Sequence, residues 1–358
     1  MSEVPLGIGV LGAGSFVAQR AVLPAIAAAP TCRLVAAASR SGAVPEPWAG
    51  AAVDDYDDVL AHPDVEAVYL PLPNGMHREW TERAAAAGKH VLCEKPLAPD
   101  AETARAMVDT CRDAGVLLAE AWMTPFHRRY ADVLERARRG DLGELLAVDA
   151  SFRFTIGPEA SGNYRWDADQ GGGALLDVGI YCLGPIVELL GDDPIGMEAR
   201  QRRRRGVDAA TTAVLDFDGG ARGSLVCSFV DDERQQLSIS GTEGSLTIGD
   251  EAFTGGVADT SVTAVAGPPV DGPADGPATA PPASSTFDVE GNDPYRAMVE
   301  AFADAVRGRS PWPRPAERSV ELLELLDRIR RAASGDGEPG RPGAPAAETS
   351  SPGGGGRG

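Results

Sequence analysis

Lysine is scarce in this sequence, and the scarcity directs attention to the few lysines that are present. Of the 33 lysine and arginine residues in the 358-residue chain, only Lys89 and Lys95 are lysines. The pKa of a lysine ammonium shifts when the group is desolvated, which suits proton chemistry, whereas an arginine guanidinium stays charged. Each lysine is therefore either a solvated surface group or a group with a chemical role. Its position in the predicted fold distinguishes the two possibilities.

Other scarcities exclude whole classes of protein. The five cysteines are scattered without CxxC spacing, which argues against a zinc site and favours reduced thiols in the cytoplasm. A net charge of -20 offers no basic footprint for nucleic acid. We identify no basic leader and no apolar run long enough to span a bilayer. We therefore expect a cytoplasmic protein without a metal, nucleic-acid or membrane partner.

The first third of the chain alternates strand and helix patterns. Short apolar runs at 6–11, 33–38, 65–70, 89–93 and 116–119 are separated by helical segments. This alternation predicts an α/β domain over residues 1–123, with a doubly wound parallel Rossmann sheet.

The pattern changes near residue 124. Strand-like runs at 145–156, 211–217, 223–230, 235–240 and 245–248 follow one another through short turns. Consecutive strands predict an antiparallel sheet, so we expect a second, α+β domain over residues 124–333 that ends in two amphipathic helices, 293–306 and 316–333. Residues 267–285 are expected to form a mobile loop, and residues 334–358 a disordered tail.

A glycine turn follows the first strand. The segment Gly12-Ala13-Gly14-Ser15-Phe16-Val17 precedes a helical pattern over 18–28, which is typical of a dinucleotide site. Gly12 allows the tight turn, and Gly14 lets the backbone approach a pyrophosphate at the helix N-terminus. Ser15 and Phe16 belong to the same cofactor-binding turn. Val17 stands where Gly or Ala is usual, so we expect looser helix packing there.

The end of the second strand bears on the choice of cofactor. NAD-specific sites place an acidic residue here to hold the ribose 2′-hydroxyl, but this chain has Ser39-Arg40. An arginine can make planar, charge-assisted hydrogen bonds to a 2′-phosphate. The alternative is an arginine that only solvates a loop. We predict NADP as the cofactor, with NAD possible.

Three further segments carry candidate chemistry. Glu94-Lys95-Pro96 ends the fourth strand, at the sheet edge where ligands of open α/β sheets bind. Asp177 and Tyr181 lie four residues apart after three glycines, so both project from one helix face. Tyr181 could exchange a proton if a cation such as Lys95 lowered its pKa from about 10. The alternatives are a solvated lysine, a structural aspartate and a core tyrosine. His77 opens a helix and faces either the cofactor or the surface.

Taken in order, these segments resemble the glucose-fructose oxidoreductase / inositol dehydrogenase / MocA family over residues 5–333. The matching segments are Gly12-Ala13-Gly14, Leu72-Pro73-Asn74 with His77, Glu94-Lys95-Pro96, Glu120-Ala121-Trp122-Met123, and Gly171-Gly172-Gly173 through Asp177, Gly179 and Tyr181. The resemblance implies that the second domain has a large open sheet, through which a homodimer or homotetramer forms. It also implies catalytic roles for Lys95, Tyr181 and Asp177. Further cofactor contacts are implied for Leu72, Asn74, His77, Glu94, Lys95, Arg165 and Trp166.

A tyrosine at position 181 is typical of one branch of this family. Many members, the inositol dehydrogenases among them, have histidine at this place, whereas the tyrosine-type members mostly use NADP. The resemblance therefore implies an NADP-preferring oxidoreductase that transfers a hydride between the nicotinamide and a sugar or related cyclic polyol. Two alternatives remain: an NAD-dependent inositol-type polyol dehydrogenase, and a non-catalytic NADP-sensing regulator. The joint presence of Lys95, Asp177 and Tyr181 argues against the regulator.

Overall fold

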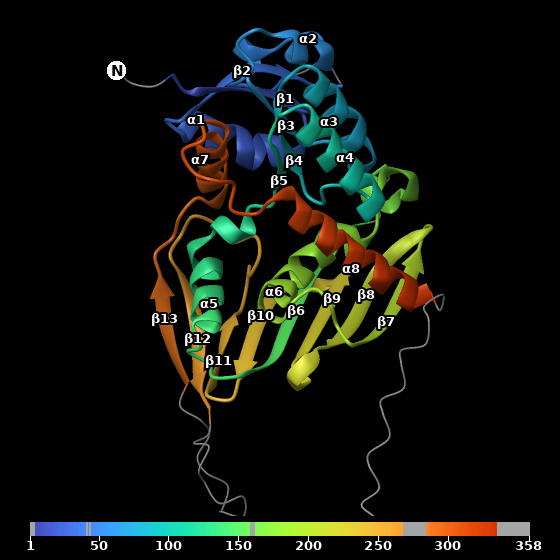
Figure 1. Cartoon of the computed structure of the whole chain (residues 1–358), viewed down its shortest axis with the longest axis vertical. Coiled ribbons are helices and arrows are strands. Elements are labelled where there is room, and N and C mark those ends of the chain that lie inside the picture. Colours follow the sequence, from blue (N-terminus) through green and yellow to red (C-terminus); the bar gives the residue numbers. More distant parts are fainter. Residues whose placement is uncertain (1–3, 41, 43, 158–161, 268–283, 335–358) are drawn as a thin grey trace, which may run out of the picture.

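Two sheets organise the molecule, one above the other in Figure 1. This computed structural model describes residues 4–40, 42, 44–157, 162–267 and 284–334. Most of the expected mobile loop and the expected tail therefore lie outside the described residues.

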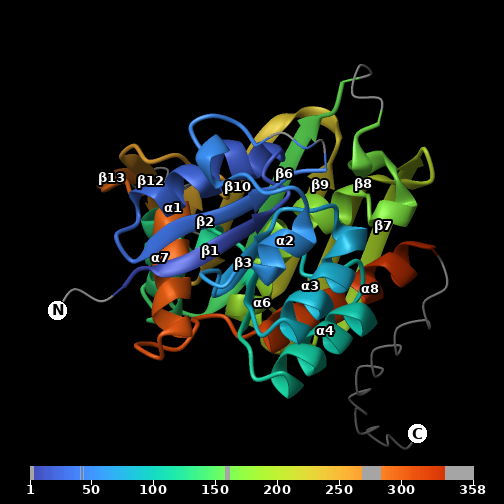
Figure 2. The ribbon, with the colours of Figure 1, turned by 90° about the horizontal axis from the view of Figure 1, so that it is seen from above.

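The upper sheet has five parallel strands in the order β2-β1-β3-β4-β5, which confirms the predicted doubly wound fold. Helices cover both of its faces: α1 and α7 (Pro294–Val306) lie on one side, and α2, α3 and α4 on the other (Figure 2). Being buried on both faces, its strands are apolar without alternation. The strands are β1 (Leu6–Leu11), β2 (Cys32–Ala38), β3 (Ala67–Leu70), β4 (His90–Glu94) and β5 (Leu118–Ala121), and the helices are α1 (Leu23–Ala28), α2 (Tyr56–Ala61), α3 (His77–Ala86) and α4 (Ala101–Asp113).

The helix after the glycine turn does not begin as an α-helix. Ala18–Val22 forms a π-helical turn that leads into α1. A π-helical turn is wider than an α-helical one, and such turns are frequent at functional sites. The turn directly follows Val17, where we expected looser packing.

The lower sheet has eight strands in the order β13-β12-β11-β10-β6-β9-β8-β7. All neighbours are antiparallel except β6 and β9, which confirms the mostly antiparallel sheet. Helices α5 (Arg128–Arg138), α6 (Ile180–Leu190) and α8 (Ala316–Ser334) contact it. The strands are β6 (Leu145–Thr155), β7 (Gly196–Arg204), β8 (Val207–Asp216), β9 (Arg222–Ser228), β10 (Val230–Gly241), β11 (Gly244–Ile248), β12 (Thr260–Ala266) and β13 (Ser284–Val289).

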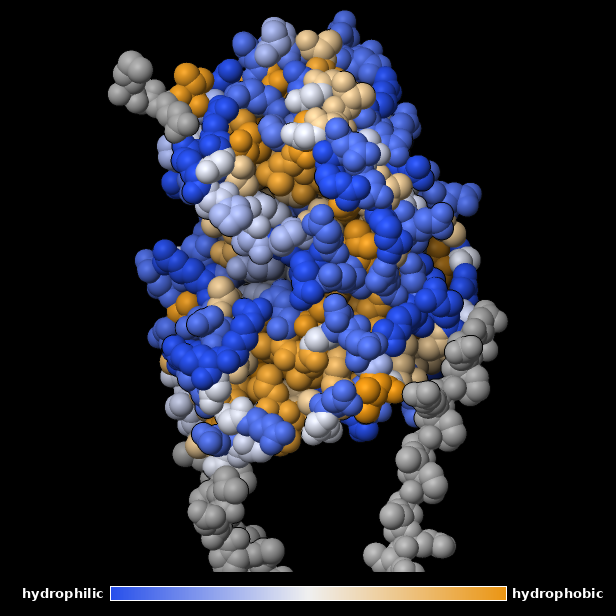
Figure 3. Space-filling model, viewed as in Figure 1, coloured by the Kyte–Doolittle hydropathy of each residue, from blue (hydrophilic) through white to orange (hydrophobic). Residues whose placement is uncertain are grey.

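The helices do not close completely over this sheet. Apolar side chains reach the surface of the lower half, in the area of α5 and α6 (Figure 3). The opposite face carries no helix among the residues described (Figures 1 and 2).

One helix of the C-terminal region returns to the upper half. α7 (Pro294–Val306) follows β13 but packs against α1, and Met298, Val299 and Phe302 are fully buried in the same core as β1 and β3. The chain then crosses back, because α8 contacts both α4 and β7. The upper half is therefore built from two stretches that lie far apart in the sequence.

The expectation that no segment is apolar enough to span a bilayer needs a correction. The helical stretch Ala168–Leu190 passes that test by length and composition. Its apolar window, however, is 83% buried inside the protein, where α6 packs on β6 and β9. A core helix of a globular domain meets the same criteria, so we assign this segment to the protein interior.

Candidate active site

A pocket lies between the two halves of the molecule, at the carboxyl ends of the parallel strands. Its volume is about 780 Å³. The upper half contributes the glycine turn, the loop after β3 and the end of β4, whereas the lower half contributes β6 and the segment before α6. The lining residues are Ser15, Phe16, Val17, Arg20, Ala21, Pro71, Leu72, Pro73, Asn74, Glu94, Lys95, Ala121, Met123, Phe152, Phe154, Asn163, Tyr164, Arg165, Asp177, Val178, Tyr181, Thr254 and Tyr295.

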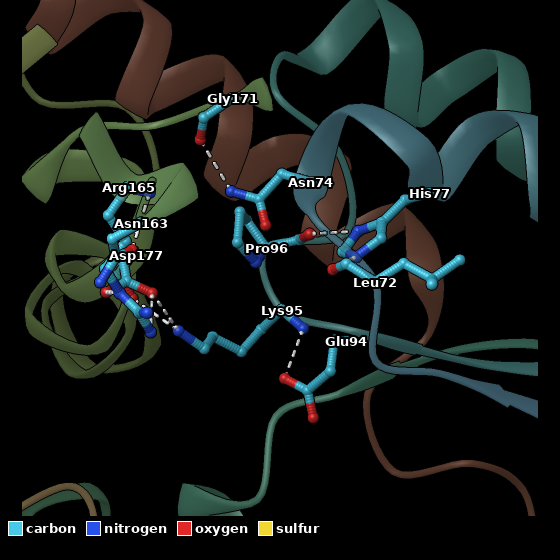
Figure 4. Close-up of polar contacts among 10 residues, drawn as sticks. All are labelled: Leu72, Asn74, His77, Glu94, Lys95, Pro96, Asn163, Arg165, Gly171 and Asp177. Carbon is cyan, nitrogen blue, oxygen red and sulfur yellow. Dashed lines mark hydrogen bonds and ion pairs between the residues drawn. The ribbon is translucent and has the colours of Figure 1, made fainter. Parts of the chain in front are cut away.

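Three of the lining residues, Lys95, Arg165 and Asp177, form a charge cluster (Figure 4). Lys95 Nζ donates to the backbone oxygen of Asp177 at 2.8 Å and to its Oδ1 at 3.0 Å. From the other side, Arg165 Nε donates to Asp177 Oδ2 at 2.6 Å. The two cations hold the pKa of the Asp177 carboxyl well below its usual range despite burial, so it is ionised. The cluster therefore carries one net positive charge.

The position of Lys95 is fixed by the elements around it. β4 ends at Glu94, and the chain then turns through a cis Lys95–Pro96 bond. Glu120, at 1% exposure, accepts from Leu97 N through Oε1 at 2.8 Å and from Ser319 Oγ through Oε2 at 2.7 Å. This carboxylate anchors the segment that follows Lys95, so Glu120 positions the lysine without lining the pocket.

The glycine-rich segment brings Arg165 onto Asp177. Gly172 and Gly173 lie directly beneath the Tyr164–Trp166 turn, and Gly173 N donates to Arg165 O at 3.0 Å. A Cβ on Gly172 would lie 2.6 Å from Arg165 O, so only glycine permits this approach. Asp177 itself sits in a π-helical turn, Leu175–Gly179, that leads into α6. Gly172 and Gly173 thus let the turn that carries Arg165 pack closely against the start of the next helix.

Tyr181 contacts Lys95, but its pKa does not shift in the direction that we expected. Lys95 Nζ lies 4.9 Å from the centre of the Tyr181 ring, over its face. Burial, together with the negative charges of Glu94 and Asp177, raises the pKa of Tyr181 well above 10. The expectation that Lys95 lowers this pKa is wrong, because desolvation of the phenolate outweighs the cation. Tyr181 is therefore a protonated phenol at neutral pH.

Glu94 is a buried carboxyl beside the cluster. Its Oε1 accepts from Tyr69 Oη at 2.7 Å, and its Oε2 accepts from Lys95 N at 3.2 Å. Burial raises the pKa of Glu94 to about 7, although Lys95 and Tyr69 oppose the shift. Glu94 therefore changes its charge within the physiological pH range.

The glycine turn, which reaches the pocket through Ser15 and Phe16, suits a dinucleotide. Gly12 has a φ of 109°, and Gly12 N and Ala13 N both donate to Ala38 O at the end of β2. Gly14 is exposed, and a Cβ there would lie 2.7 Å from Ser39 Oγ. The turn therefore presents bare backbone beside Ser39, the start of a helix and the exposed Arg40. These groups fit a pyrophosphate and an adjacent phosphorylated ribose.

His77 and Trp166, both assigned to the cofactor from the sequence, do not line this pocket. His77 is fully buried, with Nδ1 3.0 Å from Pro96 O and Nε2 2.9 Å from Leu72 O. It ties the loop after β3 to the segment after Lys95 (Figure 4). Trp166 packs edge-on against Phe229 and does not line the pocket. Leu72 and Asn74 do line it, and Asn74 Nδ2 donates to Gly171 O at 2.8 Å.

Tyr295 is a pocket residue that sequence reasoning missed. It lies in the first turn of α7, where Asp293 Oδ1 accepts from Tyr295 N and Arg296 N at 3.0 Å each. Burial raises the pKa of the Tyr295 phenol, and the neighbouring Tyr181 and Glu94 raise it further. The Asp-Pro start of this helix is visible in the sequence, but nothing there shows that α7 returns to the pocket.

A parallel sheet with a glycine turn, and a lysine, an aspartate and a tyrosine between two domains, define a Rossmann-fold oxidoreductase. Two family profiles agree with this class. The profile for the oxidoreductase family with an NAD-binding Rossmann fold matches residues 6–121, and the GFO/IDH/MocA C-terminal domain matches residues 130–247. The chain belongs to the GFO/IDH/MocA oxidoreductase family, which confirms the resemblance seen in the sequence.

Similar proteins act on sugars. A dTDP-3,4-didehydro-2,6-dideoxy-α-D-glucose 3-reductase of Streptomyces violaceoruber is 39% identical over 84% of this chain and 85% of its own. A D-xylose 1-dehydrogenase (NADP(+)) of Haloferax volcanii is 35% identical over 85% and 90%. The solved structure of a 3-ketoreductase from Actinomadura kijaniata, in complex with NADP and TDP-benzene, matches with a TM-score of 0.81 and 31% identity, over 92% of this chain and 98% of that one.

Proposed function

We propose that this protein is an NADP-dependent sugar oxidoreductase that works as a keto-sugar reductase. The observation that carries the proposal is the positively charged Lys95–Asp177–Arg165 cluster beside the protonated Tyr181, in one pocket with the glycine turn. The similar proteins support NADP as the cofactor and a sugar as the substrate. Arg40 at the end of β2 supports the same cofactor.

The hydrogen-bond donors of the Lys95 ammonium group indicate its role. An ammonium group has three N–H donors, and Asp177 takes two of them. Within the described ranges Lys95 Nζ has no other hydrogen-bond partner, so one N–H remains for a substrate oxygen. The net positive charge of the cluster stabilises negative charge that develops on that oxygen.

Tyr181 supplies the proton. A nicotinamide cofactor held at the glycine turn, Gly12–Phe16, would supply the hydride for the carbonyl carbon. Tyr181 transfers its phenolic proton to the carbonyl oxygen, which becomes a hydroxyl group. A phenol whose pKa lies well above 10 is protonated at neutral pH and serves as an acid. This protonation state favours reduction over oxidation.

We further propose where the protein acts and how it assembles. The cysteines, all buried and free, fit the reducing cytoplasm. The face of the eight-stranded sheet without a described helix offers a surface for a homodimer or homotetramer. Light scattering on the purified protein measures the oligomeric state, and a monomer at micromolar concentration would contradict this assembly.

The test of the function is a cofactor-by-substrate screen that follows NADPH absorbance. NADPH and NADH are each paired with keto sugars, and NADP and NAD with xylose, glucose and myo-inositol. We expect turnover with NADPH and a keto sugar, and loss of that turnover in Lys95→Ala with the affinity for NADPH unchanged. Turnover only with NAD and inositol would overturn both the cofactor and the substrate class. Equal turnover in Lys95→Ala would remove this lysine from the mechanism.

A further inference from the structure

The strongly acidic chain carries one dense run of positive charge that the active site does not use. Arg200 and Arg202–Arg205 lie on the edge strand β7 and in the turn that follows, and all five are exposed. None of them forms an ion pair within 4 Å among the residues described. Arg203 donates to Gly206 O, a backbone group that adds no negative charge. The positive charge of this run is therefore not offset by a neighbouring carboxylate, although the net charge of the chain is -20.

Two of these arginines are gathered on one aromatic ring. The guanidinium carbons of Arg204 and Arg205 lie 5.9 and 5.6 Å from the centre of the Trp166 ring. Both distances are within the range of a cation–π interaction, which holds a guanidinium in place while leaving its N–H groups free. Trp166 is itself fixed edge-on against Phe229. The tryptophan thus brings two guanidinium groups to the same place.

This arginine pair lies at the edge of the catalytic pocket. Trp166 belongs to the same short turn as Tyr164 and Arg165, and both of these line the pocket. Its neighbour Phe229 packs against Phe154, another lining residue. An anion bound by Arg204 and Arg205 would therefore lie beside the pocket that holds the Lys95 cluster.

We propose that Arg204 and Arg205, held by Trp166, bind the diphosphate of a nucleoside-diphosphate sugar while its sugar ring occupies the pocket. This inference rests on the proposed function, because the sugar must reach Lys95 and Tyr181. Guanidinium groups bind phosphate oxygens through paired, charge-assisted hydrogen bonds, and they do so far more strongly than they bind sugar hydroxyls. A free aldose has no group for this site, so the arginine pair selects the nucleotide-linked form of the substrate.

The test measures dTDP binding by calorimetry on the full-length protein saturated with NADP, so that the cofactor site is closed to the probe. The double variant Arg204→Gln/Arg205→Gln is compared with Arg200→Gln/Arg202→Gln. The second pair lies on the same strand and removes the same charge. We expect the first variant to bind dTDP at least 10-fold more weakly, about 1.4 kcal/mol, and the control less than 2-fold. The affinity for NADP should be the same in both.

Three results would overturn the inference. The first is no dTDP binding by the wild-type protein at millimolar concentration. The second is an equal loss in both double variants, which would mean a general field effect. The third is equal binding of thymidine and dTDP, which would remove the phosphates from recognition. Turnover of free sugars without dTDP binding would refute the arginine site and leave the oxidoreductase function intact. Conversely, dTDP binding without any NADPH turnover would support the arginine site and contradict the proposed oxidoreductase function.

Discussion

Replacing Arg165 by glutamine tests whether the charge of the cluster drives the reaction. Arg165 is one of two cations on Asp177, whose side chain is only 5% exposed. Without it the net charge of the cluster falls from +1 to zero, and Lys95 alone neutralises the carboxylate. Lys95 then offers less positive charge to the substrate oxygen. We expect kcat to fall about 10- to 100-fold, which corresponds to roughly 1.4–2.7 kcal/mol of transition-state stabilisation.

The same variant has a predictable effect on stability. The two hydrogen bonds of Arg165 to Asp177 measure 2.6 and 3.4 Å, and only the first is short. One charge-assisted hydrogen bond contributes about 1.5–3 kcal/mol, and the partial exposure of Arg165 reduces this figure. We expect the free energy of unfolding to fall by about 1–2 kcal/mol at pH 7. The pKa of Asp177 is depressed in the folded state, so its stabilising effect is present above its ordinary pKa and is lost as pH falls. In the variant the pKa of folded Asp177 is less depressed, so this loss should be smaller and should be complete at a higher pH.

Two control variants make the prediction decisive. Arg165→Lys keeps the charge and should recover part of kcat. Arg222→Gln removes an exposed arginine paired with Asp216 on the sheet surface, and it should leave kcat unchanged. Steady-state kinetics and urea unfolding are recorded on all variants. Wild-type kcat in Arg165→Gln, with an unshifted acid limb of the stability profile, would refute the role of the arginine.

Three other predictions follow from the pocket. Tyr295→Phe removes only a hydroxyl group from the pocket lining, so kcat/KM should fall about 10-fold while the melting temperature stays unchanged. An unaltered kcat/KM would exclude a contact between this hydroxyl group and the substrate. Glu94 has a raised pKa of about 7, so its buried ionisation costs stability as pH rises above about 4.5. Between pH 5 and 8 the wild type should lose roughly 2.5 kcal/mol relative to Glu94→Gln in urea titrations, and parallel pH profiles would contradict this. Gly172→Ala forces the Arg165 turn away from Asp177, so kcat should fall at least 10-fold. Gly256→Ala is the control, because a Cβ there meets nothing within 4 Å. Equal activity of the two variants would contradict the close packing of the turn on Gly172.

The sequence predicts the parts of the fold that bury apolar residues. β1 begins and ends where its apolar run does, and the central strands β6, β8, β9, β10 and β11 show the alternation that marks them. β7, β12 and β13 were missed because they lie at or next to the two edges of the eight-stranded sheet. Edge strands bury few side chains, so the alternating pattern is weak, and β7 is dominated by exposed arginines.

The candidate site was predictable in its members but not in its contacts. The lysine, the aspartate and the tyrosine were each marked by their neighbours in sequence. The pairing of Arg165 with Asp177 depends on a turn that packs closely on Gly172, and sequence spacing does not reveal such a contact. The raised pKa of Tyr181 depends on how deeply the phenol is buried, and that is a property of the folded chain alone.

The return of α7 to the upper half has a consequence for the way this enzyme can be recombined. A gene segment that ended at residue 123 would encode the five strands but not Met298, Val299 and Phe302, which fill the core against α1. A transplanted cofactor-binding half would therefore need two separate inserts, one from each end of the gene. If Ser39 and Arg40 hold the cofactor as we propose, we expect cofactor preference in such a chain to change more readily by substitution at these two positions than by exchange of modules.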